Sequence, residues 1–187
     1  MSLTDFSIVP ANETHLEIIR KIHRRAFNQE EEAGLTIAML HDDSAMPRVS
    51  LIAMDKDAPV GHILFTRVYI QNEAGEERET LAHILAPMAV LPEYQKLGIG
   101  GKLIEAGIAE LQRLRSELVF VLGHPDYYPR YGFIPDAAAY GYKTPFAIPP
   151  EAAPAWMYRA IANNVTKTVS GTVRCCLALN KEMYWRE

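Results

Sequence analysis

One stretch of the sequence constrains the fold more than any other. The apolar run at residues 81–91 reads as a strand, and three glycines follow it within four positions, Gly98, Gly100 and Gly101. After them, apolar residues recur at helical spacing as far as Leu114. A strand, a glycine-rich turn and an amphipathic helix in this order predict an α/β unit with the glycines at the start of the helix.

The rest of the chain continues this alternation of strand and helix patterns. Strands are predicted at 6–9, 49–54, 60–70, 81–91, 118–122 and 171–179, and helices at 13–27, 31–40 and 99–114. Residues 145–154 hold four prolines and predict a loop. With no internal repeat and no linker, the pattern predicts a single domain over residues 1–187, of the α/β class with a mixed sheet.

Composition narrows the classes of function. The net charge of −4 argues against a partner such as nucleic acid or an anionic membrane, because either would need a basic face. No apolar run approaches the roughly 18 residues that span a bilayer. The N-terminal residues lack the pattern of a signal peptide, and the adjacent Cys175 and Cys176 suit no disulfide framework. We therefore expect a cytoplasmic protein.

The position of the glycines suggests a phosphate site. At a helix start the backbone N–H groups are unpaired and carry the positive end of the helix dipole, and glycine lets a phosphate approach the backbone. A Walker loop is excluded because Leu103 follows Lys102 where Ser or Thr is needed and Lys96 holds the place of the first glycine. Leu103 also stands where a dinucleotide fingerprint needs its third glycine. A tight turn that binds nothing remains the alternative.

Two motifs together resemble the GNAT superfamily of N-acetyltransferases. The sequence QKLGIG at 95–100, just after a strand, resembles the acetyl-CoA signature Gln/Arg-x-x-Gly-x-Gly/Ala of that superfamily. Tyr128, four residues before Gly132-Phe133, resembles its second mark. Within the superfamily, the sequence of these motifs is most similar to that of bacterial predicted acetyltransferases of the YhbS type. The strong resemblance covers residues 80–135.

The resemblance implies a mostly antiparallel central sheet flanked by helices, with one splayed strand pair that admits the arm of CoA. Pro87 agrees with this, because proline within a strand marks an edge or a bulge. The implied cosubstrate is acetyl-CoA, with its pyrophosphate on the amides of 95–102 and its pantetheine arm on the strand at 88–90. The implied cofactor-binding residues are Met88, Ala89, Val90, Gln95, Lys96, Leu97, Gly98, Ile99, Gly100, Gly101, Lys102 and Tyr128.

The mechanism implied by the resemblance is direct attack of a neutral amine on the thioester. The amide of Met88 is expected to stabilise the oxyanion, and Tyr128 to protonate the departing thiolate. A tyrosine can serve as this acid because its reference pKa is about 10. Tyr127 and Tyr131 are nearby competitors, and a purely packing role for Tyr128 is the alternative.

No general base is evident on the central strand. Where several members of the superfamily carry a carboxylate or histidine, this chain has Ile84, and His83 beside it points to the other face by strand alternation. The acidic residues 30–32 are candidates for binding a cationic acceptor or relaying a proton, although an acidic first helical turn explains them as well. His124 and Asp126 lie beside the tyrosine motif without an assigned role.

Several functional questions stay open at this level. The enzyme reading competes with a non-catalytic acetyl-CoA-binding module that senses the cofactor or scaffolds a partner. The acceptor amine is unidentified, and a homodimer through the last strands is a further expectation. No metal site is expected, because the histidines and cysteines show no paired ligand spacing. Aromatic residues that could line an acceptor mouth, or serve only in packing, are Tyr140, Tyr142, Phe146, Trp156 and Tyr158.

Overall fold

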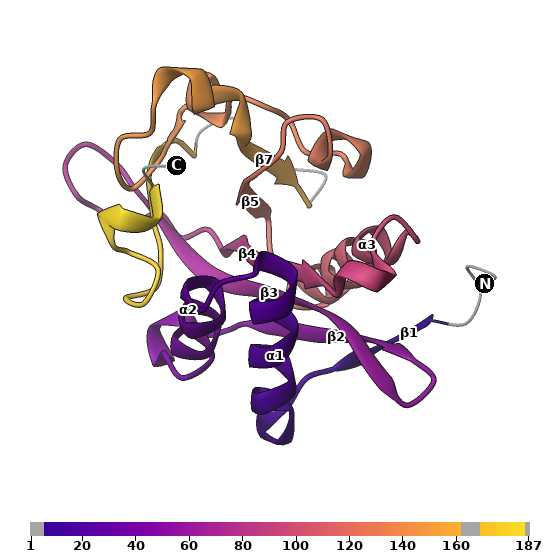
Figure 1. Ribbon diagram of the computed structural model, residues 1–187. Helices are drawn as coiled ribbons and strands as arrows, with labels where there is room; N and C mark the ends of the chain where they lie inside the picture. Colours follow the sequence, from indigo (N-terminus) through magenta and orange to yellow (C-terminus); the bar gives the residue numbers. More distant parts are fainter. Residues whose placement is uncertain (1–5, 162–168, 186–187) are drawn as a thin grey trace.

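In the computed structural model, which describes residues 6–161 and 169–185, one eight-stranded sheet runs through the molecule (Figure 1). Its strands are β1 Phe6–Pro10, β2 Val49–Asp55, β3 Ala58–Gln71, β4 Ala82–Val90, β5 Leu118–Leu122, β6 Tyr142–Lys143, β7 Trp156–Ala160 and β8 Gly171–Arg174. The main order is β1-β2-β3-β4-β5-β7, and β8 pairs with both β3 and β6. Among the described pairs only β4–β5 and β6–β8 are parallel. The predicted mixed, mostly antiparallel α/β fold is confirmed.

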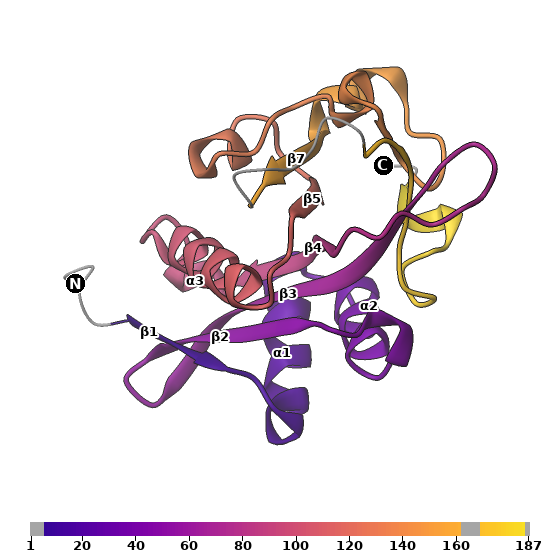
Figure 2. The same cartoon turned by 180° about the vertical axis from the view of Figure 1, so that it is seen from behind.

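Helices cover both faces of the sheet. The α-helices are α1 Leu16–Phe27, α2 Glu31–Leu40 and α3 Ile99–Arg113, and the 3₁₀ helices are η1 Glu13–His15, η2 Asp43–Ala45, η3 Pro92–Tyr94, η4 Tyr128–Tyr131, η5 Ala137–Tyr140, η6 Pro150–Ala155 and η7 Glu182–Trp185. On β3, His62 contacts His23 of α1, whereas Phe65 packs against Gly107 of α3, so α1 and α3 lie on opposite faces. Figure 1 shows α1 and α2 in front of the sheet, and Figure 2 brings α3 forward.

Strands β4 and β5 separate after a short pairing. They are paired only through the first three residues of each strand. Beyond that point β4 continues along β3 and β5 continues along β7. At the separation, Ala86 and Pro87 of β4 stand opposite the single residue Leu64 of β3, which is a β-bulge. The splayed strand pair and the irregularity at Pro87 are therefore both present.

The sequence patterns did not predict the two short strands β6 and β7. β6 has only two residues, and β7 begins directly after the proline-rich segment, whose end forms η6. Trp156, the first residue of β7, is fully buried. The pairing of β7 with β5 buries a segment whose sequence alone shows no clean alternation.

The last predicted strand is shorter than expected. The pattern predicted a strand over 171–179, but β8 ends at Arg174. The backbone N–H of Leu177 donates to Ser44 Oγ at 2.9 Å, and that of Ala178 donates to Asp42 Oδ2 at 2.8 Å. These side-chain acceptors around η2 replace a strand ladder and turn the chain away from the sheet.

Three buried histidines link the layers. His23 Nε2 lies 2.8 Å from His62 Nδ1, and His62 Nε2 lies 2.9 Å from Ser50 Oγ. His83 is also fully buried. Burial lowers the pKa of His23 to about 3 and that of His83 to about 4, and it lowers the pKa of His62 well below its usual value. All three are therefore neutral in the folded protein at neutral pH.

These histidines predict a stability that falls on acidification. Below about pH 6.5 the unfolded chain binds protons at these positions that the folded chain does not. Their stabilising contribution is thus complete above pH 6.5 and declines as the pH falls from 6.5 towards 4, by up to about 1.4 kcal/mol per histidine and pH unit. Urea unfolding at pH 7, 6 and 5 should show this decline in the free energy of unfolding.

One variant tests the assignment of this slope. His83→Gln removes one buried titrating group, so the pH dependence should become shallower by about one histidine's share even if the variant is less stable at pH 7. Equal slopes in the wild type and the variant would contradict the role given to His83.

Candidate functional site

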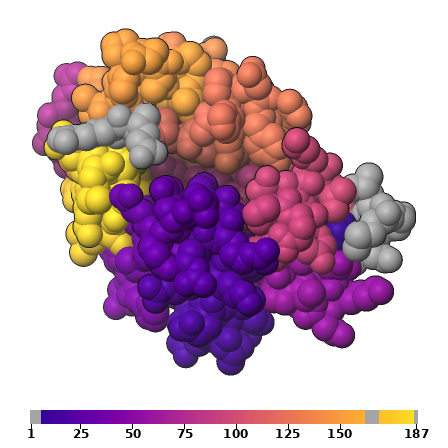
Figure 3. Space-filling model, in the orientation of Figure 1, coloured from indigo at the N-terminus to yellow at the C-terminus, as the bar shows by residue number. Residues whose placement is uncertain are grey.

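A cavity of about 780 Å³ opens where β4 and β5 separate. Its walls come from four distant parts of the chain. They are Phe27, Glu31, Glu32 and Leu35 around the α1–α2 corner; Ile84, Leu85, Ala86, Pro87 and Met88 on β4; Leu122, Gly123, His124, Pro125, Tyr127 and Tyr128 after β5, with Ala155; and Leu179, Met183, Tyr184 and Trp185 near the C-terminus. On the face shown in Figure 3, the yellow C-terminal segment adjoins the indigo helical region, and the orange segment lies above both.

One of the three cofactor-binding residues predicted on β4 lines the cavity. Met88 lines the cavity, and its Cε would lie 3.4 Å from a Cβ placed on Gly100. Ala89 is buried in the core, and the Val90 carbonyl accepts a hydrogen bond of 3.0 Å from Gln95 Nε2. This bond ties the glycine turn to the end of β4. Of the predicted residues on this strand, only Met88 therefore borders both the cavity and the turn.

The glycine turn has the features of an anion site. Gly98 is the N-cap of α3 with φ +79°, a left-handed conformation that favours glycine, and no side chain caps the first amides of the helix. The first turn carries no acidic residue. Uncapped amides at the positive end of a 15-residue helix favour an anion. Residues 95–102 lie beside the cavity rather than in its wall.

The two lysines of the turn are placed differently. Lys96 is exposed and adopts φ +63°. Lys102 is partly buried, and its ammonium lies 5.8 Å from the centroid of the Phe6 ring on β1. A cation so close to an aromatic face is attracted to it. The Lys102 side chain is thus drawn towards β1.

Two tyrosine rings provide a second reason why positions 100 and 101 are glycine. A Cβ on Gly100 would come within 2.5 Å of the Tyr127 hydroxyl, and a Cβ on Gly101 would come within 2.5 Å of the Tyr131 hydroxyl. The two rings lie 5.3 Å apart. The glycines therefore admit these rings as well as leaving the backbone open. The sequence reading explained the glycines by phosphate approach alone.

Tyr128 stands at the start of η4 and lines the cavity. A Cβ on Gly123 would overlap its ring, and Phe133 meets the ring edge-on with centroids 5.6 Å apart. Burial raises the pKa of Tyr128 to about 12, so the hydroxyl stays protonated at neutral pH. Burial also raises the pKa of Tyr127. The cavity thus holds a fixed phenolic proton donor.

The acidic residues at the start of α2 divide into two groups. Glu30 pairs with Arg20 and Arg24 at 3.4 and 3.2 Å and does not line the cavity. Glu31 and Glu32 do line it. Glu32 Oε1 accepts a 2.7 Å hydrogen bond from the neighbouring Gln29, but Glu32 Oε2 is buried and has no hydrogen-bond partner among the described residues. This oxygen is a buried acceptor beside the cavity, and a polar group so placed normally has a donor.

Ile84 and His83 of β4 lie on opposite faces of the strand, as strand alternation predicted. Ile84 lines the cavity, whereas His83 is fully buried and does not. His83 Nδ1 lies 2.9 Å from Ser116 Oγ, and its Nε2 lies 2.9 Å from the Pro47 carbonyl. These partners hold the β4 strand to the segments before β2 and after α3. His124 lines the cavity, while Asp126 does not.

His83→Ala should affect stability far more than turnover. The loss of two buried hydrogen bonds and of side-chain volume is expected to lower the free energy of unfolding by about 2–4 kcal/mol. Because the side chain does not reach the cavity, turnover at a temperature where the variant is folded should change by less than about tenfold. Chemical unfolding and steady-state rates measure the two quantities, and a loss of several orders of magnitude in rate with unchanged fold would contradict the face assignment.

The aromatic residues suggested for an acceptor mouth lie outside the cavity. None of the five lines the cavity. Tyr142 and Trp156 are buried, and Phe120 lies 5.3 Å from each of their rings. The aromatic residues that do border the cavity at its far side are Tyr184 and Trp185, which the sequence reading missed. Two aromatic residues near the C-terminus were the only signal, and no motif distinguished them.

The part of the chain that the structure describes contains neither a metal-binding cluster nor a membrane-spanning helix. No three His, Cys, Asp or Glu side chains there gather closely enough to hold a metal ion. None of the described helices combines the length and apolar character needed to span a bilayer.

Comparison with solved structures identifies the same fold elsewhere. The crystal structure of YhbS from Escherichia coli in complex with CoA superposes with a TM-score of 0.80 at 24% sequence identity, covering 95% of this chain and 93% of that one. The crystal structure of a GNAT family acetyltransferase from Brucella melitensis in complex with acetyl-CoA gives a TM-score of 0.70 at 25% identity, covering 93% and 97%.

Sequence comparison gives the family. Residues 47–135 match the model of the acetyltransferase (GNAT) domain. YhbS of Escherichia coli K12, an uncharacterized N-acetyltransferase, is 32% identical over 111 residues, which are 59% of this chain and 62% of that one. YjhQ of the same strain, also an uncharacterized N-acetyltransferase, is 42% identical over 175 residues, or 94% of each chain. The chain therefore belongs to the GNAT family of N-acetyltransferases.

Proposed function

We propose that this protein transfers the acetyl group of acetyl-CoA to a primary amine inside the cavity between β4 and β5. The observation that carries the proposal is that one cavity brings together Met88 of the splayed strand and the protonated Tyr128, beside an uncapped helix start. The family and the CoA and acetyl-CoA complexes of two structural neighbours support the choice of cosubstrate.

The cosubstrate would follow the opening between the strands. Its pyrophosphate would lie on the amides of residues 95–102, where the α3 dipole favours negative charge. Its pantetheine arm would run past Met88 along the free edge of β4, in the manner of an added strand. The thioester would then lie in the cavity near Tyr128, because Met88 borders both the cavity and the turn.

The chemical step would need two groups of the chain. The neutral amine attacks the thioester carbonyl, and its nitrogen forms a bond to that carbon while the oxygen takes the negative charge. The backbone N–H of Met88 would donate to this oxyanion. When the intermediate collapses, the C–S bond breaks, the sulfur leaves with the electron pair, and the Tyr128 hydroxyl gives it a proton. The attacking nitrogen loses its extra proton to solvent, and the Tyr128 phenolate takes a proton back from solvent, so that the amide and the CoA thiol are the products.

No side chain of the central strand would act as general base. Ile84 borders the cavity at the position where a titratable group would be useful, and His83 lies on the other face. The amine would therefore enter in its neutral form or lose its proton through water. On this account the rate should rise with pH until the acceptor amine is deprotonated.

Release of the CoA thiol in the presence of a panel of primary amines tests the proposal. Acetylated product, identified by its mass increase, should appear together with stoichiometric thiol. Acetyl-CoA binding without transfer to any amine would favour a cofactor sensor, and absence of binding would contradict both functions.

A further inference from the structure

The acceptor side of the cavity is lined by a distinct set of side chains. What they indicate about the acceptor rests on the proposed function. If the arm of acetyl-CoA takes the space between β4 and the segment after β5, the remaining walls must face the acceptor. They are the α1–α2 corner and the C-terminal segment 179–185, which together we call the acceptor wall. Its cavity-lining members are Phe27, Glu31, Glu32, Leu35, Leu179, Met183, Tyr184 and Trp185.

From this wall we infer that the acceptor is a primary amine on an apolar body, such as an aromatic ring, without a carboxylate. All wall residues apart from Glu31 and Glu32 are apolar or aromatic. Apolar surface removed from water contributes about 25 cal/mol per Å², so a buried ring favours binding by about 10- to 100-fold over a short alkyl chain. The acceptor's body, rather than its amine alone, is thus recognised.

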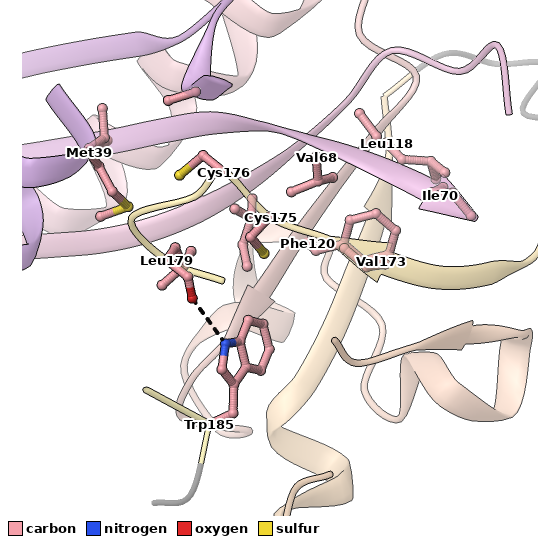
Figure 4. Close-up of a cluster of buried hydrophobic side chains, with 14 of the residues drawn as sticks. Met39, Val68, Ile70, Leu118, Phe120, Val173, Cys175, Cys176, Leu179 and Trp185 are labelled. Atoms are coloured by element: carbon pink, nitrogen blue, oxygen red, sulfur yellow. Dashed lines mark hydrogen bonds between the residues drawn. The ribbon is translucent and has the colours of Figure 1, made fainter. Parts of the chain in front are cut away.

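The C-terminal part of this wall is fixed in place. Trp185 is 2% exposed, and its Nε1 donates to the Leu179 carbonyl at 3.3 Å (Figure 4). Its ring meets that of Trp156 edge-on, with centroids 5.7 Å apart. Before it, the amide of Ala178 is held by Asp42. A wall anchored at both ends presents a defined surface to the acceptor, which is what discrimination between bodies of different shape requires.

The charged residues that line the cavity determine which charge the acceptor can carry. Among the described residues, none that lines the cavity is lysine or arginine, whereas Glu31 and Glu32 contribute carboxylates. The buried Glu32 Oε2 has no hydrogen-bond partner among the described residues, and a rotation of this side chain towards the cavity would let an ammonium or amine N–H donate to it. An amine is therefore attracted, and an acceptor that carries its own carboxylate is repelled.

The choice of acceptor is tested with four compounds of matched design. They are 2-phenylethylamine, ethylamine, phenylalanine and spermidine. The ratio kcat/KM for 2-phenylethylamine should exceed that for ethylamine by about 10- to 100-fold, and it should likewise exceed that for phenylalanine, which has the same ring and an added carboxylate. Preference for phenylalanine or spermidine, or equal use of all four, would overturn the inference.

Two variant pairs locate the selectivity at the wall. Met183 and Met46 are similarly exposed, at 55% and 50%, but only Met183 lines the cavity. Met183→Lys places a positive charge at the acceptor wall and should raise KM for 2-phenylethylamine about tenfold, whereas Met46→Lys should not. Glu32→Gln should also raise it about tenfold, and Glu30→Gln, which alters a carboxylate outside the cavity, should leave it unchanged. Acetyl-CoA affinity, measured by calorimetry, should be the same in all four.

A direct binding measurement separates this inference from the proposed function. Saturation-transfer NMR on the protein saturated with CoA reports amine binding without turnover. If 2-phenylethylamine binds and Glu32→Gln weakens it while no acetyl transfer occurs, the proposed reaction fails and the acceptor assignment stands. If transfer to other amines occurs but 2-phenylethylamine neither binds nor reacts, or if the wall variants behave as their controls, the inference is wrong and the reaction stands.

Discussion

Tyr128→Phe is expected to slow acetyl transfer by about 10²- to 10⁴-fold, the usual contribution of a positioned general acid. The substitution removes one hydroxyl and leaves the ring, which packs on Gly123 and Phe133. Stability and acetyl-CoA affinity should therefore change little, and kcat should fall with KM nearly constant, as for an interaction made in the transition state. Single-turnover transfer to a reactive amine is the appropriate measurement, because slow product release would mask the effect in steady state.

Neighbouring tyrosines supply the comparison. Tyr131 belongs to the same short helix but does not line the cavity, so Tyr131→Phe should react close to the wild-type rate. Tyr127 does line the cavity and is the competing donor. A slow Tyr127→Phe variant beside a normal Tyr128→Phe variant would make Tyr127 the proton donor. Wild-type rates in all three tyrosine variants would mean that water supplies the proton. Since the pKa of Tyr128 is about 12, the wild-type rate should show no loss from this group below about pH 11.

Replacing Gly98 and Gly100 together by valine should weaken acetyl-CoA binding by two orders of magnitude or more. Valine at Gly98 cannot adopt φ +79° without strain, and valine at Gly100 would displace the Tyr127 hydroxyl. Hydrogen bonds to a charged group contribute about 1.5–3 kcal/mol each, so losing the alignment of two amides corresponds to a roughly 100-fold or larger change. Calorimetric titration with acetyl-CoA measures it.

The matched control lies in α2. A Cβ on Gly34 meets nothing within 4 Å, so Gly34→Val should bind acetyl-CoA as the wild type does. Gly98→Asn provides a second comparison, because asparagine tolerates the left-handed conformation and should retain more affinity than valine. Unchanged affinity in the Gly98/Gly100 double variant, with its fold intact by circular dichroism, would remove the turn from the binding site.

The sequence predicted those parts of the fold whose local pattern and tertiary setting agree. The α2 bounds and the β5 bounds are as expected, because their apolar periodicities match the faces that they bury. β7 was missed because pairing with β5, and not local propensity, makes it a strand. The overlong prediction after β8 failed for a similar reason, since Asp42 and Ser44, far away in sequence, take the amides that a strand would have used.

The candidate site was predictable in its motifs and not in its walls. Tyr128 and Met88 followed from a resemblance that spans 80–135, and the structure places both at one cavity. The resemblance also placed Ile84 at the cavity face, and strand alternation then assigned His83 to the opposite face. By contrast, the acceptor wall depends on the packing of Trp185 against Trp156, a contact between residues that no local pattern relates.

The wide spacing of the cavity walls along the chain has a consequence for how the protein is made. The walls extend in sequence from Phe27 to Trp185, and the segment that closes the far side is synthesised after all the others. Ribosomes release a chain from its N-terminus at about 5–20 residues per second, so the splayed strands emerge seconds before the segment that completes the cavity. During that interval the apolar surface that later receives Trp185 is exposed, and a nascent chain stalled there is the species most prone to aggregate.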